Sequence, residues 1–235
     1  MTIKAAHKDA FLAAAANGEV EILREKLEKK QCDIDCRHKE GKTALMCAAE
    51  NGHKEIVDVL LAHNCQLDLQ DNKGQTALML AGHKGHKEIV KALLAHNCNP
   101  DLQDGYGWTT LMFAGHKGHK GIVEALVAHN CQLDLENKSI SGTALMLAVG
   151  AGQKEIVDLL LAHNLKLDLR NIDGQTALMW TARYGHKEIV ESLISHNCKL
   201  DLQDIYGRTA LMLASIYRFK EIVEVLVAHL CDMDL

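Results

Sequence analysis

The sequence contains very little proline and few aromatic residues. One proline (Pro100), three Phe, two Trp and four Tyr are spread over 235 residues, of which 48% are apolar. A hydrophobic core must therefore be built from aliphatic side chains, mainly Leu, Ile, Val, Ala and Met.

The sequence also lacks the segments that direct a chain to a membrane, to export or to nucleic acid. No run of roughly 18 apolar residues occurs, and the first nine residues contain no apolar stretch of the kind found in secretion signals. The formal net charge is −5, with no basic stripe. We therefore expect a cytoplasmic protein, with the nucleus as a second possibility, that binds neither membrane nor nucleic acid.

The eight cysteines do not form the pattern of a disulfide framework. Six of them recur at one position of a repeated unit: Cys32, Cys65, Cys98, Cys131, Cys198 and Cys231. Equivalent positions in adjacent helical units lie roughly 8–10 Å apart, beyond the ~7 Å limit for a bridge. We expect reduced thiols that fill the core, as in cytosolic and nuclear proteins. Cys36 and Cys47 lie outside this ladder, and the spacing of Cys32 and Cys36 is a poor one for zinc.

A tetrapeptide of the form Thr-x-Leu-Met returns six times. It begins at Thr43, Thr76, Thr109, Thr143, Thr176 and Thr209, at intervals of 33, 33, 34, 33 and 33 residues. Periods of this length indicate an array of like units, each of which buries its apolar face against its neighbours. Such arrays present surfaces for binding and seldom build catalytic pockets.

Each unit reads as two short helices followed by an extended loop. Thr43 is a good helix N-cap, whose hydroxyl accepts from an N–H two or three residues on, and Gly52 can end that helix in the left-handed conformation. A second helix is predicted from about His53 to His63, with Asn64 as its stop. The following residues alternate and then turn at Lys73-Gly74 before the next Thr.

These marks resemble the ankyrin-repeat family over essentially the whole chain. The matching segments of one unit are Asp71-x-x-Gly74-x-Thr76-x-Leu78, Gly85-His86-x-Glu88-Ile89-Val90 and Asn97-Cys98-Asn99-Pro100-Asp101-Leu102. Thr-Ala-Leu-Met stands where the family has Thr-Pro-Leu-His, so we expect somewhat less rigid hairpins. The resemblance implies an all-α solenoid of helix-turn-helix units joined by β-hairpin-like loops.

We predict a single ankyrin-repeat domain over residues 1–235. Residues 1–37 form an N-terminal capping repeat, in which Asp9 stands in the place of the Thr. The other repeats cover residues 38–70, 71–103, 104–137, 138–170, 171–203 and 204–235. The extra residue of the 34-residue interval lies in Ser139–Gly142 and is expected to distort one hairpin.

No catalytic motif stands out, and the histidines are a weak metal signal. The sequence has no Gly-rich phosphate loop, G-x-S-x-G or H-E-x-x-H. The pairs His83/His86 and His116/His119 are the better metal candidates, but Gly85 and Gly118 interrupt each pair. The second His belongs to the family's structural Gly-His turn. We predict no enzyme activity, no cofactor and no metal site, and treat an enzyme as a remote alternative.

The family resemblance implies where a partner would bind. In ankyrin repeats the hairpin tips and the two residues before the Gly of the first helix line the concave face. All four tyrosines lie at these positions, and Tyr, Trp and Arg are enriched in binding hot spots. The competing interpretation is that these exposed aromatics are incidental. The predicted partner-binding residues are Lys73, Gln75, His83, Lys84, Tyr106, Trp108, His116, Lys117, Arg183, Tyr184, Tyr206, Arg208 and Tyr217.

The sequence thus predicts a non-enzymatic adaptor or scaffold that binds an unidentified protein partner on its concave face. The alternative is an engineered or recently duplicated scaffold with no dedicated partner. The last repeat, residues 204–235, is as apolar as an internal repeat. We therefore expect it to pack against another molecule, for example by self-association, or to mark where a longer protein was cut. Trp180 replaces an apolar residue of a first helix and is expected in the core.

Overall fold

The computed structural model describes residues 3–233, and within them every regular element is a helix. The contacts divide the chain into two compact units. The first unit holds residues 1–114 and 121–131, and the second holds residues 115–120 and 132–235.

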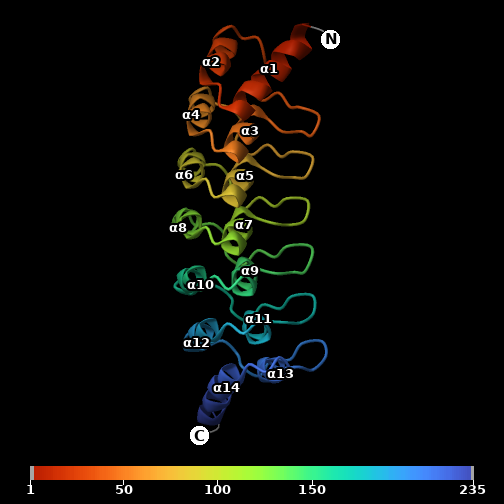
Figure 1. Ribbon diagram of the computed structural model, residues 1–235, viewed down its shortest axis with the longest axis vertical. Coiled ribbons are helices and arrows are strands. Elements are labelled where there is room, and N and C mark those ends of the chain that lie inside the picture. Colours follow the sequence, from red (N-terminus) through yellow and green to blue (C-terminus); the bar gives the residue numbers. More distant parts are fainter. Residues whose placement is uncertain (1–2, 234–235) are drawn as a thin grey trace. The chain divides into compact units, whose positions relative to one another are not determined.

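In the first unit the helices alternate between two rows (Figure 1). The first helix of each repeat lies in one row, which contains α1 (Ile3–Asn17), α3 (Ala44–Asn51) and α5 (Ala77–Lys84). The second helix of each repeat lies in the other row, which contains α2 (Val20–Glu28), α4 (Lys54–Ala62) and α6 (Lys87–Ala95). The helix α7 (Thr110–Lys117) begins in this unit, which also contains most of α8 (Lys120–Ala128). The loops before α3 and α5 project on the side of the first helices that faces away from the second helices.

The second unit repeats this order (Figure 1). Its first helices are α9 (Ala144–Gly150), α11 (Ala177–Tyr184) and α13 (Ala210–Ile216), and its second helices are α10 (Lys154–Leu161), α12 (Lys187–Ser195) and α14 (Lys220–Met233). Here too the loops before the first helices lie on the far side from the second helices. We call this side of each unit its hairpin side.

The helix boundaries follow from the predicted capping residues. The Thr76 hydroxyl accepts a hydrogen bond from the Met79 N–H at 3.2 Å, and the other five threonines of the tetrapeptide make the same bond. Such a cap contributes about 1 kcal/mol. Gly52 ends α3 at φ 80°, and Asn64 follows α4 at φ 55°. The predicted starts and stops of the repeat are confirmed. In one repeat the Met46 sulfur also accepts from the Thr43 N–H at 3.4 Å.

Two sets of histidines serve the repeat backbone. His63 contacts the carbonyl of Val59 through Nδ1 at 2.8 Å, and its counterparts His96, His129, His163, His196 and His229 do the same one turn back. His53 and His86 instead reach the preceding repeat, where their Nε2 atoms contact the carbonyls of Ala16 and Glu50. Because a carbonyl only accepts, each of these nitrogens carries the proton. The histidines therefore donate hydrogen bonds to backbone carbonyls near helix ends, where carbonyls lack partners within the helix.

The core is aliphatic, as the composition predicts. The methionines Met46, Met79, Met112, Met146 and Met179 are each 1% exposed and lie among buried Leu, Ile, Val and Ala. Cys65, Cys98, Cys131 and Cys198 are buried free thiols. Burial raises the pKa of the Cys98 thiol to about 12, assisted by Asp68. At the ends of the ladder the prediction of core filling is wrong, because Cys32 is half-buried and Cys231 is exposed.

Three local expectations need correction. Asp9 is not an N-cap, because α1 already begins at Ile3; the residues before Asp9 are strong helix formers with no turn residue. α14 continues past His229 to Met233, because Leu230 stands where four other repeats have a left-handed Asn. Trp180 is half-buried rather than buried.

The inserted residue widens its hairpin, as expected. The Asn137 N–H donates to the carbonyl of Gly142, five residues on, whereas in the other hairpins the equivalent hydrogen bond joins residues four apart.

Candidate functional site

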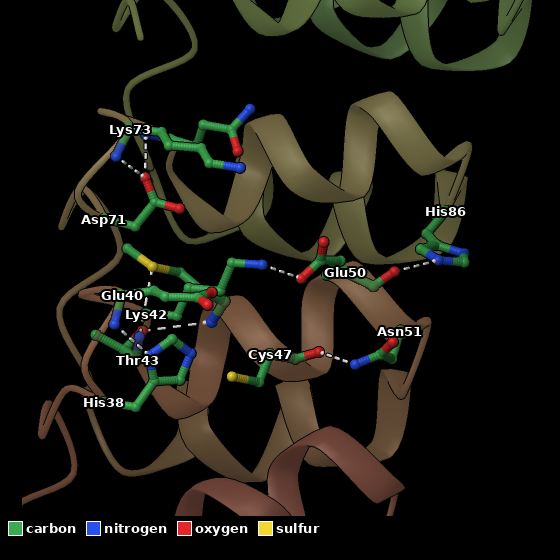
Figure 2. Close-up of polar contacts among 12 residues, drawn as sticks. His38, Glu40, Lys42, Thr43, Cys47, Glu50, Asn51, Asp71, Lys73 and His86 are labelled. Atoms are coloured by element: carbon green, nitrogen blue, oxygen red, sulfur yellow. Dashed lines mark hydrogen bonds and ion pairs between the residues drawn. The ribbon is translucent and has the colours of Figure 1, made fainter. Parts of the chain in front are cut away.

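Each hairpin is built around one side chain that holds its turn. The Oδ1 atom of Asp71 accepts from the N–H groups of Lys73 at 2.8 Å and Gln75 at 2.9 Å (Figure 2). In the first hairpin His38 takes this role, and its Nδ1 accepts from the Glu40 N–H at 2.8 Å. These bonds leave the residues between the turn and the capping Thr free to vary.

Backbone hydrogen bonds join neighbouring hairpin tips within each unit. In the first unit the N–H of Asn72 donates to Glu40 at 3.0 Å, and the N–H of Gly105 donates to Lys73 at 2.8 Å. In the second unit the N–H of Ile172 donates to Ile140, and that of Ile205 donates to Asp173. The tip side chains of each unit are therefore held at fixed spacing on one side.

The hairpin side of the first unit is mainly polar. Lys42, in the first hairpin, forms an ion pair with Glu50 at the end of α3 (Figure 2). Lys73 and Lys84 are exposed, whereas Gln75 is half-buried. Lysine and glutamate are strongly hydrated, so this stretch presents charge rather than apolar area.

The first unit also holds an aromatic group on the same side. The ring of Trp108 lies 5.0 Å from that of Phe113, and the ring of His83 lies 5.2 Å from Phe113. Tyr106, at the hairpin tip, is 67% exposed. The His83 and Phe113 rings meet edge-on at 65°, and the Trp108 and Phe113 rings are tilted by 31°; ring pairs at such distances attract one another. Phe113 was not among the predicted residues, because it lies neither at a hairpin tip nor in the two residues before the Gly of a first helix.

Arginine and tyrosine side chains interleave on the hairpin side of the second unit. The guanidinium carbon of Arg183 lies 5.9 Å from the ring centres of both Tyr184 and Tyr217. Arg208 lies 4.7 Å from the ring centre of Tyr206. Cation–π contacts within about 6 Å are attractive. These five residues, which come from α11, the C-cap of α13 and one hairpin, form what we call the arginine–tyrosine surface.

Arg208 also closes its own hairpin through Asp204. Its Nε and Nη2 atoms lie 2.8 and 2.7 Å from Oδ2 of Asp204. Burial opposes ionisation of this carboxyl, but the hydrogen bonds from Arg208 and the Tyr206 N–H outweigh it and lower the pKa of Asp204 to about 2. These two contacts to one carboxylate oxygen hold the guanidinium of Arg208 near the ring of Tyr206.

The thirteen predicted positions are thus not one cluster. His83 and Trp108 meet through Phe113, and the arginine–tyrosine surface brings five more together. Lys73, Lys84, His116 and Lys117 are exposed, and Gln75 lies half-buried in its own turn. Two exposed tip residues, Ile172 and Ile205 at 58% and 61% exposure, were missed because the search favoured Tyr, Trp and Arg.

A shallow hollow near the start of the first unit was also missed. It measures about 380 Å³ and is lined by residues of α1, the first hairpin and α3, among them Leu12, His38, Lys42, Cys47 and Glu50. Cys47 is the buried cysteine of this lining, and burial raises the pKa of its thiol. No group of three His, Cys, Asp or Glu in the described part of the chain could hold a metal ion.

Comparison with known proteins identifies the family. The family model for ankyrin repeats (3 copies) matches residues 11–104, 84–171 and 163–235. The chain therefore belongs to the ankyrin-repeat family, and its fold is the all-α ankyrin-repeat solenoid. It is similar to the crystal structure of the human ASB11 ankyrin repeat domain, with a TM-score of 0.79 and 24% identity over 93% of this chain and 96% of that one. A search of curated proteins found no match.

These findings define the general class of function. Ankyrin repeats are generally protein–protein interaction modules, and the fold is typically a non-enzymatic scaffold. None of the helices in residues 3–233 is long and apolar enough to cross a membrane.

Proposed function

We propose that this chain is a non-enzymatic adaptor that binds a protein partner on its hairpin side, with the arginine–tyrosine surface as the centre of the contact. We further propose that residues 1–235 act as one ankyrin-repeat domain in the cytoplasm or the nucleus, and the free thiols support such a location. The partner is expected to be neither a membrane nor a nucleic acid.

The observation that carries this proposal is the exposure of large aromatic side chains at varying positions of an otherwise repeated structure. Tyr206 is 69% exposed, Tyr184 47% and Tyr217 44%. Tyrosine and arginine dominate the binding energy of many interfaces, because they bury large areas with few rotatable bonds. The exposed Ile172 and Ile205 extend the apolar area over the adjacent tips.

The arginine–tyrosine surface is also ordered before any partner arrives. Arg183 is held between two rings, and Arg208 is held by Asp204 and Tyr206. Side chains that are already fixed lose less conformational entropy on binding. A partner therefore gains more of the contact energy than it would from mobile lysines.

The charges favour a particular kind of partner. Asp204 neutralises Arg208, whereas within the described residues Arg183 contacts tyrosine rings and no carboxylate. An exposed guanidinium beside aromatic rings suits a partner segment that offers a carboxylate next to apolar side chains.

A comparison of partner capture by two matched variants tests this proposal. We expect the combined change Arg183→Ala, Tyr184→Ala and Tyr206→Ala to weaken binding of captured partners by about 2 kcal/mol or more, roughly 30-fold. The control variant, Glu88→Ala, Lys91→Ala and Glu191→Ala, changes exposed residues of the second helices and should bind normally. Equal capture by both variants would favour the alternative of a scaffold without a dedicated partner.

A second candidate is self-association through α13 and α14. Met212 is 49% exposed, although its counterparts in the other repeats are 1% exposed, and Ile216 one turn on in α13 and Val227 in α14 are exposed as well. Exposed apolar patches of this kind mark interaction sites. Sedimentation over a wide concentration range should then show a dimer that Met212→Glu dissociates, and a monomer at all concentrations would remove this candidate.

A further inference from the structure

Two cysteines flank the turn that links α2 to the first hairpin. The sulfur atoms of Cys32 and Cys36 lie 3.0 Å apart. Between them the Cys36 N–H donates to the Asp33 carbonyl at 3.0 Å, and the Asp35 N–H donates to Asp33 Oδ1 at 3.1 Å. The turn therefore holds the two thiols against each other.

This pair occurs only once in the array. Cys32 occupies the ladder position, but Cys36 stands where the other repeats have a leucine: Leu69, Leu102, Leu135, Leu169 and Leu202. The repeat fold places these two positions together in the first loop, and the substitution of one leucine turns a single thiol into a dithiol.

The pair also differs from the other cysteines in access. Cys32 and Cys36 are half-buried, whereas Cys47, Cys65, Cys98, Cys131 and Cys198 are buried and Cys231 is exposed without a second cysteine beside it. A small oxidant can reach the pair, and each sulfur has its resolving partner in contact. A disulfide bond of ~2.05 Å needs the sulfurs to approach by only about 1 Å more.

We propose that Cys32 and Cys36 are a thiol modification site, which a low-molecular-weight disulfide such as oxidised glutathione converts to an intramolecular disulfide. One cysteine sulfur attacks the oxidant, forms a mixed disulfide and releases one molecule of reduced thiol. The second cysteine displaces the other molecule. One S–S bond forms and one breaks, and the two protons of the cysteines end on the two released thiols.

The new bond would tighten the junction between the capping repeat and the next repeat. Asp35, inside the loop, accepts from the Gln66 N–H at 3.0 Å, and Arg37 donates to the Gln70 carbonyl at 2.8 Å. Both contacts reach the next loop. Burial raises the pKa of Cys36 above its usual range, so the reaction is expected to be slower than that of an exposed thiol.

Peptide mapping by mass spectrometry after treatment with oxidised glutathione tests the proposal. We expect the peptide that holds both cysteines to lose two hydrogen atoms, reversibly on addition of a reductant, while the peptide with Cys65 keeps its thiol. Cys36→Leu, which restores the residue of the other repeats, should abolish this product and leave the circular dichroism spectrum unchanged. Cys231→Ser should leave the product in place.

Three results would overturn the proposal. The first is a wild-type pair that stays reduced while Cys231 becomes glutathionylated, since the oxidant is then shown to be active. The second is a stable glutathione adduct at Cys32 with no loss of hydrogen atoms. The third is an intermolecular bridge that survives in the Cys36→Leu variant.

Discussion

The hairpin sides of the two units share one backbone and present different chemistry. The first unit shows the ion pair of Lys42 and Glu50 and the exposed Lys73, whereas the second shows the stacked arginines and tyrosines. In both, a Thr caps a first helix and the Met three residues on is buried, as at Thr76 and Met79 and at Thr176 and Met179. The repeated positions therefore set the fold, and the positions between them set what each unit can bind.

The largest expected effect tests whether the shared backbone is equally stable in both units. Met79→Ala and Met179→Ala should each lower the free energy of unfolding by ~2–5 kcal/mol, because both side chains are fully buried. Met212→Ala should change it by no more than about 0.5 kcal/mol, since its side chain is half exposed. Denaturant midpoints at constant m-value measure all three.

An unexpected loss at Met212 would be informative. If Met212→Ala costs as much as Met179→Ala, then the face of α13 is covered in solution, as self-association requires. Unequal losses at Met79 and Met179 would contradict the idea of a common backbone in the two units.

The pH dependence of the second unit should be the next largest effect. Because the folded-state pKa of Asp204 is lowered from 3.8 to about 2, its ion pair with Arg208 stabilises the fold above pH ~4, and that stability is lost as the pH falls toward 2. The shift corresponds to roughly 2 kcal/mol at most. Asp204→Asn should remove this part of the acid sensitivity, measured as the free energy of unfolding at pH 2 and pH 6.

The chain supplies its own control for this change. Asn171 occupies the position of Asp204 in the preceding repeat, and its Oδ1 accepts from the N–H groups of Asp173 and Gln175. The Asn variant should therefore keep the turn. Unchanged acid sensitivity in Asp204→Asn would show that other carboxylates dominate.

The fold could be predicted because its determinants are local and repeated. A Thr cap, a left-handed Gly and a left-handed Asn act within a few residues of their own positions, so their repetition along the chain identifies them without tertiary information. The last repeat departs from the pattern where one residue changed, as at Leu230. A change that occurs in one repeat only cannot be recognised from the repetition, so its effect on the helix end was not predicted.

The contacts of the candidate site were less predictable, because they join side chains from different repeats. Trp180 is the clearest example. It was expected in the core like Leu80 and Leu147, but its indole lies against Gly150 at the end of α9, so close that an added Cβ would lie 3.0 Å from the ring. The glycine makes room for the larger side chain on the hairpin side. Likewise, the contact of Cys32 with Cys36 depends on the turn between them.

The smallest expected effect concerns the one irregular hairpin. Ser141 has φ 51°, whereas the residue at the same distance from the capping Thr in the other hairpins is a glycine, for example Gly174 at φ 73°. A side chain in this conformation is strained by roughly 1 kcal/mol, so Ser141→Gly should raise the free energy of unfolding by up to about that amount. The matched change, Gly174→Ser, should lower it by more, because the new Cβ would lie 3.1 Å from the Ile205 backbone nitrogen. Thermal unfolding should show shifts of ~2–4 °C per kcal/mol, and a lower melting temperature for Ser141→Gly would mean that the serine side chain stabilises the widened hairpin.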